Sequence, residues 1–169
     1  MPVTYKKIAT ATVGAGGVAN VEFTSIDQTF TDLVVHACAR STRTGFPVDD
    51  MVIRFNGSTT GYNTRRLYAV GTGISNDNVT SDLRGFVSDA DSTASAFGSN
   101  IFYIPNYTAA THKSVHIDGA GETNATNAGL VLAAGLWQNT AAITTIRLFA
   151  NNGNLVEHST FTLYGISKS

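Results

Sequence analysis

Two histidines and an aspartate have the spacing that comes nearest to a metal site. His112 and His116 are four residues apart, which on a helix would bring two imidazoles together as zinc ligands. The segment alternates, however, with Val115 and Ile117 on one side and His116 and Asp118 on the other, and this is the period of a strand. We therefore expect the three residues to make polar contacts across strands or at an interface, and we predict no metal site.

Two close pairs of carboxylates have the composition of a glycosidase acid–base pair. Asp49 and Asp50 precede a predicted strand, and Asp89 and Asp91 lie in a serine-rich segment, so turn capping explains both pairs better. A calcium site at Asp89 and Asp91 would need a longer series of oxygen ligands, which the neighbouring residues do not supply. No catalytic residue is predicted.

Other motifs of catalysis and cofactor binding are missing from the sequence. The glycine-rich stretch 14–17 is not followed by the Lys-Ser/Thr of a phosphate-binding loop, and no Gly-x-Ser-x-Gly elbow occurs. The single cysteine, Cys38, lies in an alternating apolar segment, where a buried and unreactive thiol is expected. His36 in the same segment is expected to be a core histidine. We predict a protein that is not an enzyme and binds no cofactor.

The elements that carry these residues are predicted to be strands. Turn residues such as Asn56-Gly57 separate them, and amphipathic helical patterns are nearly missing. We expect the segment 31–40 to be a central strand buried on both faces. Nine or ten short strands predict an all-β fold, an antiparallel β-sandwich of jelly-roll type. The main alternating segments are 5–13, 18–26, 31–40, 51–55, 100–104, 113–118, 129–137, 144–150 and 159–166.

The length of 169 residues suits a single domain, residues 1–169. Regular alternation is lost between Ser58 and Ser99, apart from short islands at 66–70 and 83–87. We predict a long irregular insertion over residues 58–99. Irregular stretches of this length inside a compact domain are commonly functional or contact regions.

Aromatic and arginine side chains gather in and just before this part of the chain, and both types are enriched in the cores of protein interfaces. The alternative is that these residues fold back over the domain's own core. Trp137, at the end of an apolar segment, is expected in the core. The residues predicted to contact a partner are Phe46, Tyr62, Arg65, Arg66 and Tyr68.

Composition argues against several classes of partner. Charged residues form 14% of the chain and the net charge is -1, so no long-range attraction to nucleic acid or to anionic membrane is expected. The longest apolar run, 129–137, is too short to span a bilayer, and the chain opens without a signal peptide, so we expect synthesis in a host cytoplasm and no membrane insertion. A surface poor in charge but rich in Thr and Asn loses its water at low cost, which favours protein contacts.

A series of short phrases runs in order from Tyr5 to Ile166. They are Asp32-Leu33-Val34-Val35, Arg40-Ser41-Thr42-Arg43, Ile53-Arg54-Phe55-Asn56-Gly57, Tyr62-Asn63, Ile104-Pro105-Asn106-Tyr107, Lys113-Ser114, Gly135-Leu136-Trp137 and Phe161-Thr162-Leu163-Tyr164-Gly165-Ile166. In this ordered series the chain resembles small virion proteins of tailed phages, of the kind found in cyanophages. The resemblance implies a non-enzymatic component of the capsid or tail, in a group where jelly-roll-like sandwiches and trimers are common.

The function predicted from the sequence is that of a capsid cement or decoration protein, which binds the outer shell of a virion and stabilises it. The predicted partners are further copies of the chain, as a homotrimer, and the major capsid protein or other virion proteins. The alternative is a tail or fibre module that binds a host-surface glycan by stacking sugars on exposed aromatic side chains.

Overall fold

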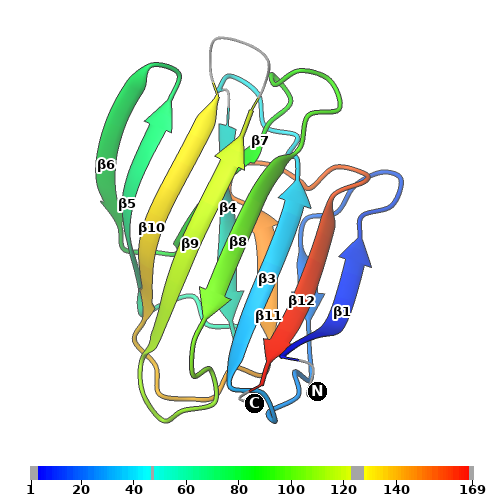
Figure 1. The fold of residues 1–169 in the computed structure, drawn as a ribbon. Helices are drawn as coiled ribbons and strands as arrows, with labels where there is room; N and C mark the ends of the chain where they lie inside the picture. Colours follow the sequence, from blue (N-terminus) through cyan, green and yellow to red (C-terminus); the bar gives the residue numbers. More distant parts are fainter. Residues whose placement is uncertain (1–3, 47, 123–127, 168–169) are drawn as a thin grey trace.

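The computed structural model describes residues 4–46, 48–122 and 128–167. These residues form twelve strands, all paired antiparallel, in two sheets that pack face to face (Figure 1). Within the described ranges there is no helix, and hence no helix able to cross a membrane.

The larger sheet has eight strands and the smaller has four. In spatial order the larger sheet contains β1 (Tyr5–Thr12), β12 (Thr160–Ile166), β3 (Asp32–Ala39), β8 (Gly98–Ile104), β9 (Lys113–Gly121), β10 (Gly129–Trp137), β5 (Tyr62–Val70) and β6 (Gly73–Val79). The smaller sheet contains β2 (Val21–Phe23), β11 (Ile146–Ala150), β4 (Val48–Phe55) and β7 (Leu83–Ser88).

The strand order is that of a jelly roll with two added hairpins. The orders β1-β12-β3-β8 and β2-β11-β4-β7 face each other. Successive strands of this set alternate between the two sheets, except β4 and β7, which pair with each other in the smaller sheet. The hairpins β5–β6 and β9–β10 are inserted between strands of that set and add four strands to one side of the larger sheet. The predicted all-β, jelly-roll-like sandwich is confirmed.

The core lies between the sheets, where the apolar side chains of alternating strand positions meet. Trp137 is 1% exposed; its ring stacks on Tyr62 at 6.1 Å and meets Phe55 edge-on at 5.5 Å. The core position predicted for Trp137 is confirmed.

The irregular insertion predicted over residues 58–99 is wrong, because this segment contains β5, β6, β7 and the start of β8. Two features explain why β5 and β6 show no alternating hydrophobic pattern in the sequence. In β5 the inward positions Thr64 and Arg66 are polar, so inside and outside do not differ in hydrophobicity. In β6 nearly every residue is polar or glycine, because the strand lies at the end of the sheet and buries little.

The central strand β3 also departs from expectation. Leu33, Val34 and Val35 are buried as predicted, but His36 and Cys38 in the second half are exposed. His36 packs edge-on against Tyr164 at 5.4 Å on the outside of the sheet. The predictions of a core histidine and a buried thiol are therefore wrong, since both side chains lie on the side of the sheet that the described residues leave exposed at these positions.

Candidate functional site

The most distinctive surface of the molecule is the side of the eight-stranded sheet that points away from the small sheet. In β9 and β10 the residues alternate between buried and exposed almost without exception. The inward positions hold mostly small or apolar side chains, which pack on the small sheet, and the outward positions are left without cover. We call the exposed side of β5, β8, β9 and β10 the outer face.

Large aliphatic side chains stand on the outer face and on its neighbour β6. Strand register places Leu132 directly opposite Leu67, and Leu130 and Ile74 on the two sides of Ala69. On the other side of β10, Leu132 is opposite Asp118, which is in turn opposite Ile101. We call these five side chains the aliphatic patch; their exposed fractions are 56% for Leu67, 81% for Ile74, 38% for Ile101, 56% for Leu130 and 52% for Leu132.

The outer face is hollowed beside the aliphatic patch. An open hollow of about 750 Å³ lies there, with Leu67 and Leu132 in its lining. Tyr103 of β8 also lines it, and its hydroxyl donates a hydrogen bond to Asp32 at 2.9 Å, which raises the pKa of the tyrosine. The remaining lining is mixed in character and comprises Arg65, Arg66, Asn76, Pro105, Ser114, Val115, His116, Ala133 and Ala134.

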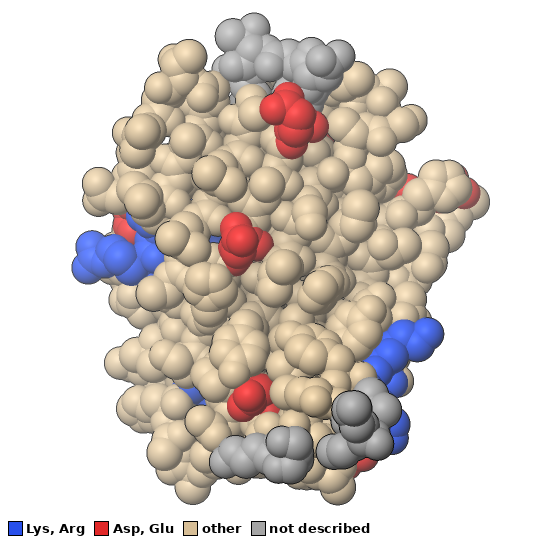
Figure 2. Space-filling model, viewed as in Figure 1, with Lys and Arg blue, Asp and Glu red and all other residues tan. Residues whose placement is uncertain are grey.

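Charge is sparse on this side of the molecule. Figure 2, which views the outer face, shows a few acidic and basic side chains in a surface that is mostly uncharged. His116 and Asp118 of β9 share this face, as predicted from their alternation, and His112 is exposed just before the strand. Among the described residues no three His, Cys, Asp or Glu side chains come together as a possible metal site.

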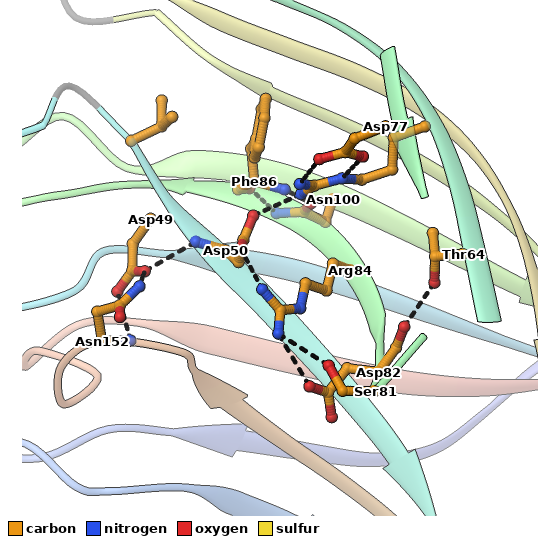
Figure 3. Close-up of polar contacts among 12 residues, drawn as sticks. Asp49, Asp50, Thr64, Asp77, Ser81, Asp82, Arg84, Phe86, Asn100 and Asn152 are labelled. Atoms are coloured by element: carbon orange, nitrogen blue, oxygen red, sulfur yellow. Dashed lines mark hydrogen bonds and ion pairs between the residues drawn. The ribbon is translucent and has the colours of Figure 1, made fainter. Parts of the chain in front are cut away.

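Most of the molecule's paired charges lie elsewhere, in a chain of ion pairs that joins the two sheets (Figure 3). Arg66 of β5 binds Asp77 of β6 and Asp50 of β4, each at 2.6 Å. Asp50 also binds Arg84 of β7 at 2.8 Å, and Arg84 continues to Asp82 at 3.1 Å. We call this series the ion-pair chain; it starts in the larger sheet and ends in the smaller one.

The electrostatics of the ion-pair chain favour the charged forms of Arg66, Asp77 and Asp82. Burial by itself would lower the pKa of Arg66, but hydrogen bonds to Asp77 and the charge of Asp50 outweigh it and raise the pKa. The hydrogen bond from Arg66 lowers the pKa of Asp77. Burial tends to raise the pKa of Asp82, yet hydrogen bonds from Arg54, Ser81 and Arg84 bring it below its ordinary value. Groups held ionised in this way are suited to fastening strands and not to proton transfer.

The carboxylates predicted to cap turns divide into two cases. Asp49 and Asp50 lie within β4 and not before it; Asp49 is fully buried and accepts a hydrogen bond from Asn152 at 3.0 Å, so turn capping is wrong for this pair. Asp89 does cap a turn, because one of its oxygens accepts the backbone N–H groups of Asp91 at 3.0 Å and Ser92 at 3.2 Å. Burial raises the pKa of Asp89.

The residues predicted to contact a partner are not brought together. Phe46 is 58% exposed, with the Arg43 guanidinium 4.1 Å from its ring centre, and Arg65 is exposed at the hollow. Tyr62 is buried, with its hydroxyl accepting the Phe55 N–H at 2.8 Å.

Two further members of that predicted set face the chain's own interior. Arg66 is only 7% exposed and occupied by the ion-pair chain, and the half-buried Tyr68 meets Phe86 edge-on at 5.7 Å. Tyr62, Arg66 and Tyr68 thus cover the domain's own core, which was the alternative to an interface, because even-numbered positions of β5 point inward.

The aliphatic patch was not anticipated from the sequence. Its signal is present in β10, where Leu130 and Leu132 alternate with the equally apolar Val131 and Ala133. A strand that is apolar on both sides either packs against protein on both faces or exposes one apolar face to solvent. The sequence pattern alone does not distinguish these two cases.

No protein-family model matches the chain, and no curated protein matches its sequence.

Proposed function

We propose that this chain is a non-enzymatic structural protein of a tailed-phage virion, a cement or decoration protein that binds the outer shell of the capsid. It contacts its neighbours through the outer face. The observation that carries the proposal is the aliphatic patch, five large aliphatic side chains exposed on one face of a sheet that carries few charges. The ordered resemblance to phage virion proteins is the basis for proposing that this partner is part of a virion.

Burial energetics favour a protein as the ligand of this surface. Covering a leucine or isoleucine side chain stabilises a complex by about 1.5 to 3 kcal/mol when burial is complete, and Leu67, Leu130 and Leu132 are each about half-exposed at present. Asp118 stands between Leu132 and Ile101, so a partner must pair this carboxylate or leave it hydrated for that gain to be kept. Contiguous apolar surface on a soluble domain is a mark of an interaction site.

The ion-pair chain supports a structural role for Asp50, which belongs to one of the two close carboxylate pairs of the sequence, and for Asp77 and Asp82. Asp50, Asp77 and Asp82 each have an arginine partner within 3.1 Å, so their oxygens are engaged in fastening the sheets. The proposed partners are the major capsid protein or another virion protein, and the proposed location is the virion. The homotrimer implied by the resemblance remains a prediction.

A tail or fibre module that binds host glycan is the second candidate. The hollow favours it, because Tyr103 offers an aromatic face and His116 and Asn76 offer hydrogen-bonding groups. Glycan binding is the weaker of the two proposals, because Leu67 and Leu132 also line the hollow and provide neither a stacking ring nor a hydrogen bond to a sugar.

Quantitative mass spectrometry of purified virions tests the proposal, with the major capsid protein and a known tail protein of the same particle as internal standards. A cement protein is expected in a copy number comparable with that of the major capsid protein. A copy number equal to that of the tail standard, together with binding on a glycan array, would favour the second candidate. Complete absence from virions would refute both.

A further inference from the structure

The two sheets of the sandwich have four edges, formed by β1, β6, β2 and β7. An edge strand presents unpaired N–H and C=O groups, and soluble proteins usually block such an edge with lysine, proline, a bulge, a short strand or a covering segment. Three of the four edges are blocked by one of these devices.

Strand β1 carries the exposed Lys6 and Lys7, and its register with β12 shifts between Lys7 and Ala9. Strand β2 has only three residues, too few to form a stable pair with a strand of another chain. Strand β7 is covered from within, because the side chain of Asn100 accepts the backbone N–H of Phe86 at 2.9 Å and also donates to the backbone carbonyl of Phe86.

Strand β6 has none of these protections. It has seven residues, Gly73–Val79, without lysine, arginine or proline, and its register with β5 is continuous. Its one charged side chain, Asp77, is held by Arg66 through two hydrogen bonds. Within the described part of the chain, no backbone hydrogen bond reaches the free side of β6. The edge is therefore open, continuous in its register with β5 and held to β5 through Asp77.

We propose that β6 pairs antiparallel with β6 of a second copy of this chain, so that the larger sheets of the two copies join into one. The register that pairs all seven residues sets Asn76 opposite Asn76 of the other copy, on a two-fold axis. The same register sets Ile74 opposite Asn78 and Asp77 opposite Ser75, so the two Asp77 carboxylates do not face each other.

Continuity with the aliphatic patch supports a second copy as the occupant. Ile74 is 81% exposed on β6 and lies on the same side of the sheet as Leu67 and Leu132 of the neighbouring strands. Two-fold pairing through β6 brings the patches of both copies onto one face of a joined sheet. This goes beyond the proposed function, since it does not depend on which virion protein the outer face contacts.

Cysteine cross-linking of the full chain tests the register directly. Cys38 is exposed, so each variant is made in a Cys38→Ser background. In an antiparallel pair the two Cα atoms opposite each other are about 4.5 to 5.5 Å apart, which is within the range of a disulfide. Asn76→Cys is therefore expected to give a covalent dimer on oxidation.

Asn78→Cys is the matched control on the same strand. The two copies of position 78 are offset by four residues along the paired strands, about 13 Å, so this variant is expected to form no covalent dimer. A mixture of Ile74→Cys and Asn78→Cys proteins is expected to give a dimer with one chain of each. Equal cross-linking of the Asn76→Cys and Asn78→Cys proteins, or none with Asn76→Cys, would overturn the proposal.

Light scattering over a series of protein concentrations gives an independent measurement. The unmodified chain is expected to form a two-fold dimer, and not the homotrimer that the resemblance implies. Asn76→Lys is expected to dimerise at least about tenfold more weakly, because two like charges then meet on the axis. Ser114→Lys adds the same charge to the exposed side of β9 and is expected to leave dimerisation unchanged. A monomer at every concentration, or a trimer insensitive to Asn76→Lys, would overturn the proposal. If the protein dimerises in solution but is missing from virions, only the proposed function is refuted. If it is found in virions but is a monomer in solution, only this inference is refuted.

Discussion

Arg66 and Asp50 belong to different sheets, and their side chains meet at 2.6 Å on the side of the sandwich where β5 and β6 lie. The same guanidinium holds Asp77 of β6, so one buried cation ties the last strand of the larger sheet to the smaller sheet. The position of the outer face and of the open edge depends on this contact.

Replacing Arg66 with methionine is expected to lower the free energy of unfolding by about 3 kcal/mol, because Asp77 loses its arginine partner and the partly buried Asp50 keeps only Arg84. Arg65→Met is the matched control, since the neighbouring side chain is exposed, and it is expected to change that free energy by no more than about 0.5 kcal/mol. Urea unfolding followed by circular dichroism measures both. Equal effects of the two substitutions would show that the ion-pair chain does not hold the sheets together.

Acid is expected to destabilise the fold through Asp77 and Asp82. The pKa of each is lowered in the folded protein, so the stability that they contribute is present above their unfolded pKa of about 3.9 and is lost as pH falls through their folded pKa values. The urea midpoint of the unmodified chain should therefore fall on acidification below about pH 4. A double variant, Asp77→Asn with Asp82→Asn, should be less stable at neutral pH and lose less on acidification. A loss identical to that of the unmodified chain would contradict the assignment.

The thiol of Cys38 is expected to react with a maleimide in the folded protein, because it is exposed on the outside of β3. The rate should be comparable with that of the chain unfolded in urea, which serves as the reference. A thiol that reacts only after unfolding would mean that another layer covers this part of the sheet.

Polar substitutions in the aliphatic patch are expected to weaken docking without unfolding the chain. Leu67→Asn with Leu132→Asn removes two half-exposed leucines that lie opposite each other, and binding to virions produced without this protein should weaken at least about tenfold. Thr10→Asn with Thr12→Asn is the control, on exposed positions of β1 in the same sheet. Co-sedimentation with the virions measures the binding, and circular dichroism checks the fold. Equal binding by both double variants would remove the aliphatic patch from the interface.

The strands that pack one apolar side on the core were predictable from the sequence. In β9, inward Val115 and Ile117 alternate with outward His116 and Asp118, so the period of two is visible without a structure. The hairpin β5–β6 was not predictable in this way, because the inward Arg66 is as polar as the outward Arg65.

Contacts between sheets were beyond sequence reasoning for a different reason. Arg66 and Asp50 are sixteen residues apart. No local sequence pattern indicates that β4 and β5 belong to different sheets, or that these two side chains meet between the sheets. The aliphatic patch was missed because an outward leucine such as Leu132 has the same sequence context as a core leucine. Only the sheet order reveals that no further layer covers it.

Hydroxyl-radical footprinting of the chain on intact virions and free in solution is the most direct test that the outer face binds the particle. Leu67, Leu130 and Leu132 are expected to be oxidised in the free chain and protected on the virion, while Tyr5, which is 51% exposed on the far edge strand β1, should be oxidised equally in both. Leucines that react equally on the virion and in solution, or protection confined to Tyr5 and the small sheet, would contradict docking through the outer face.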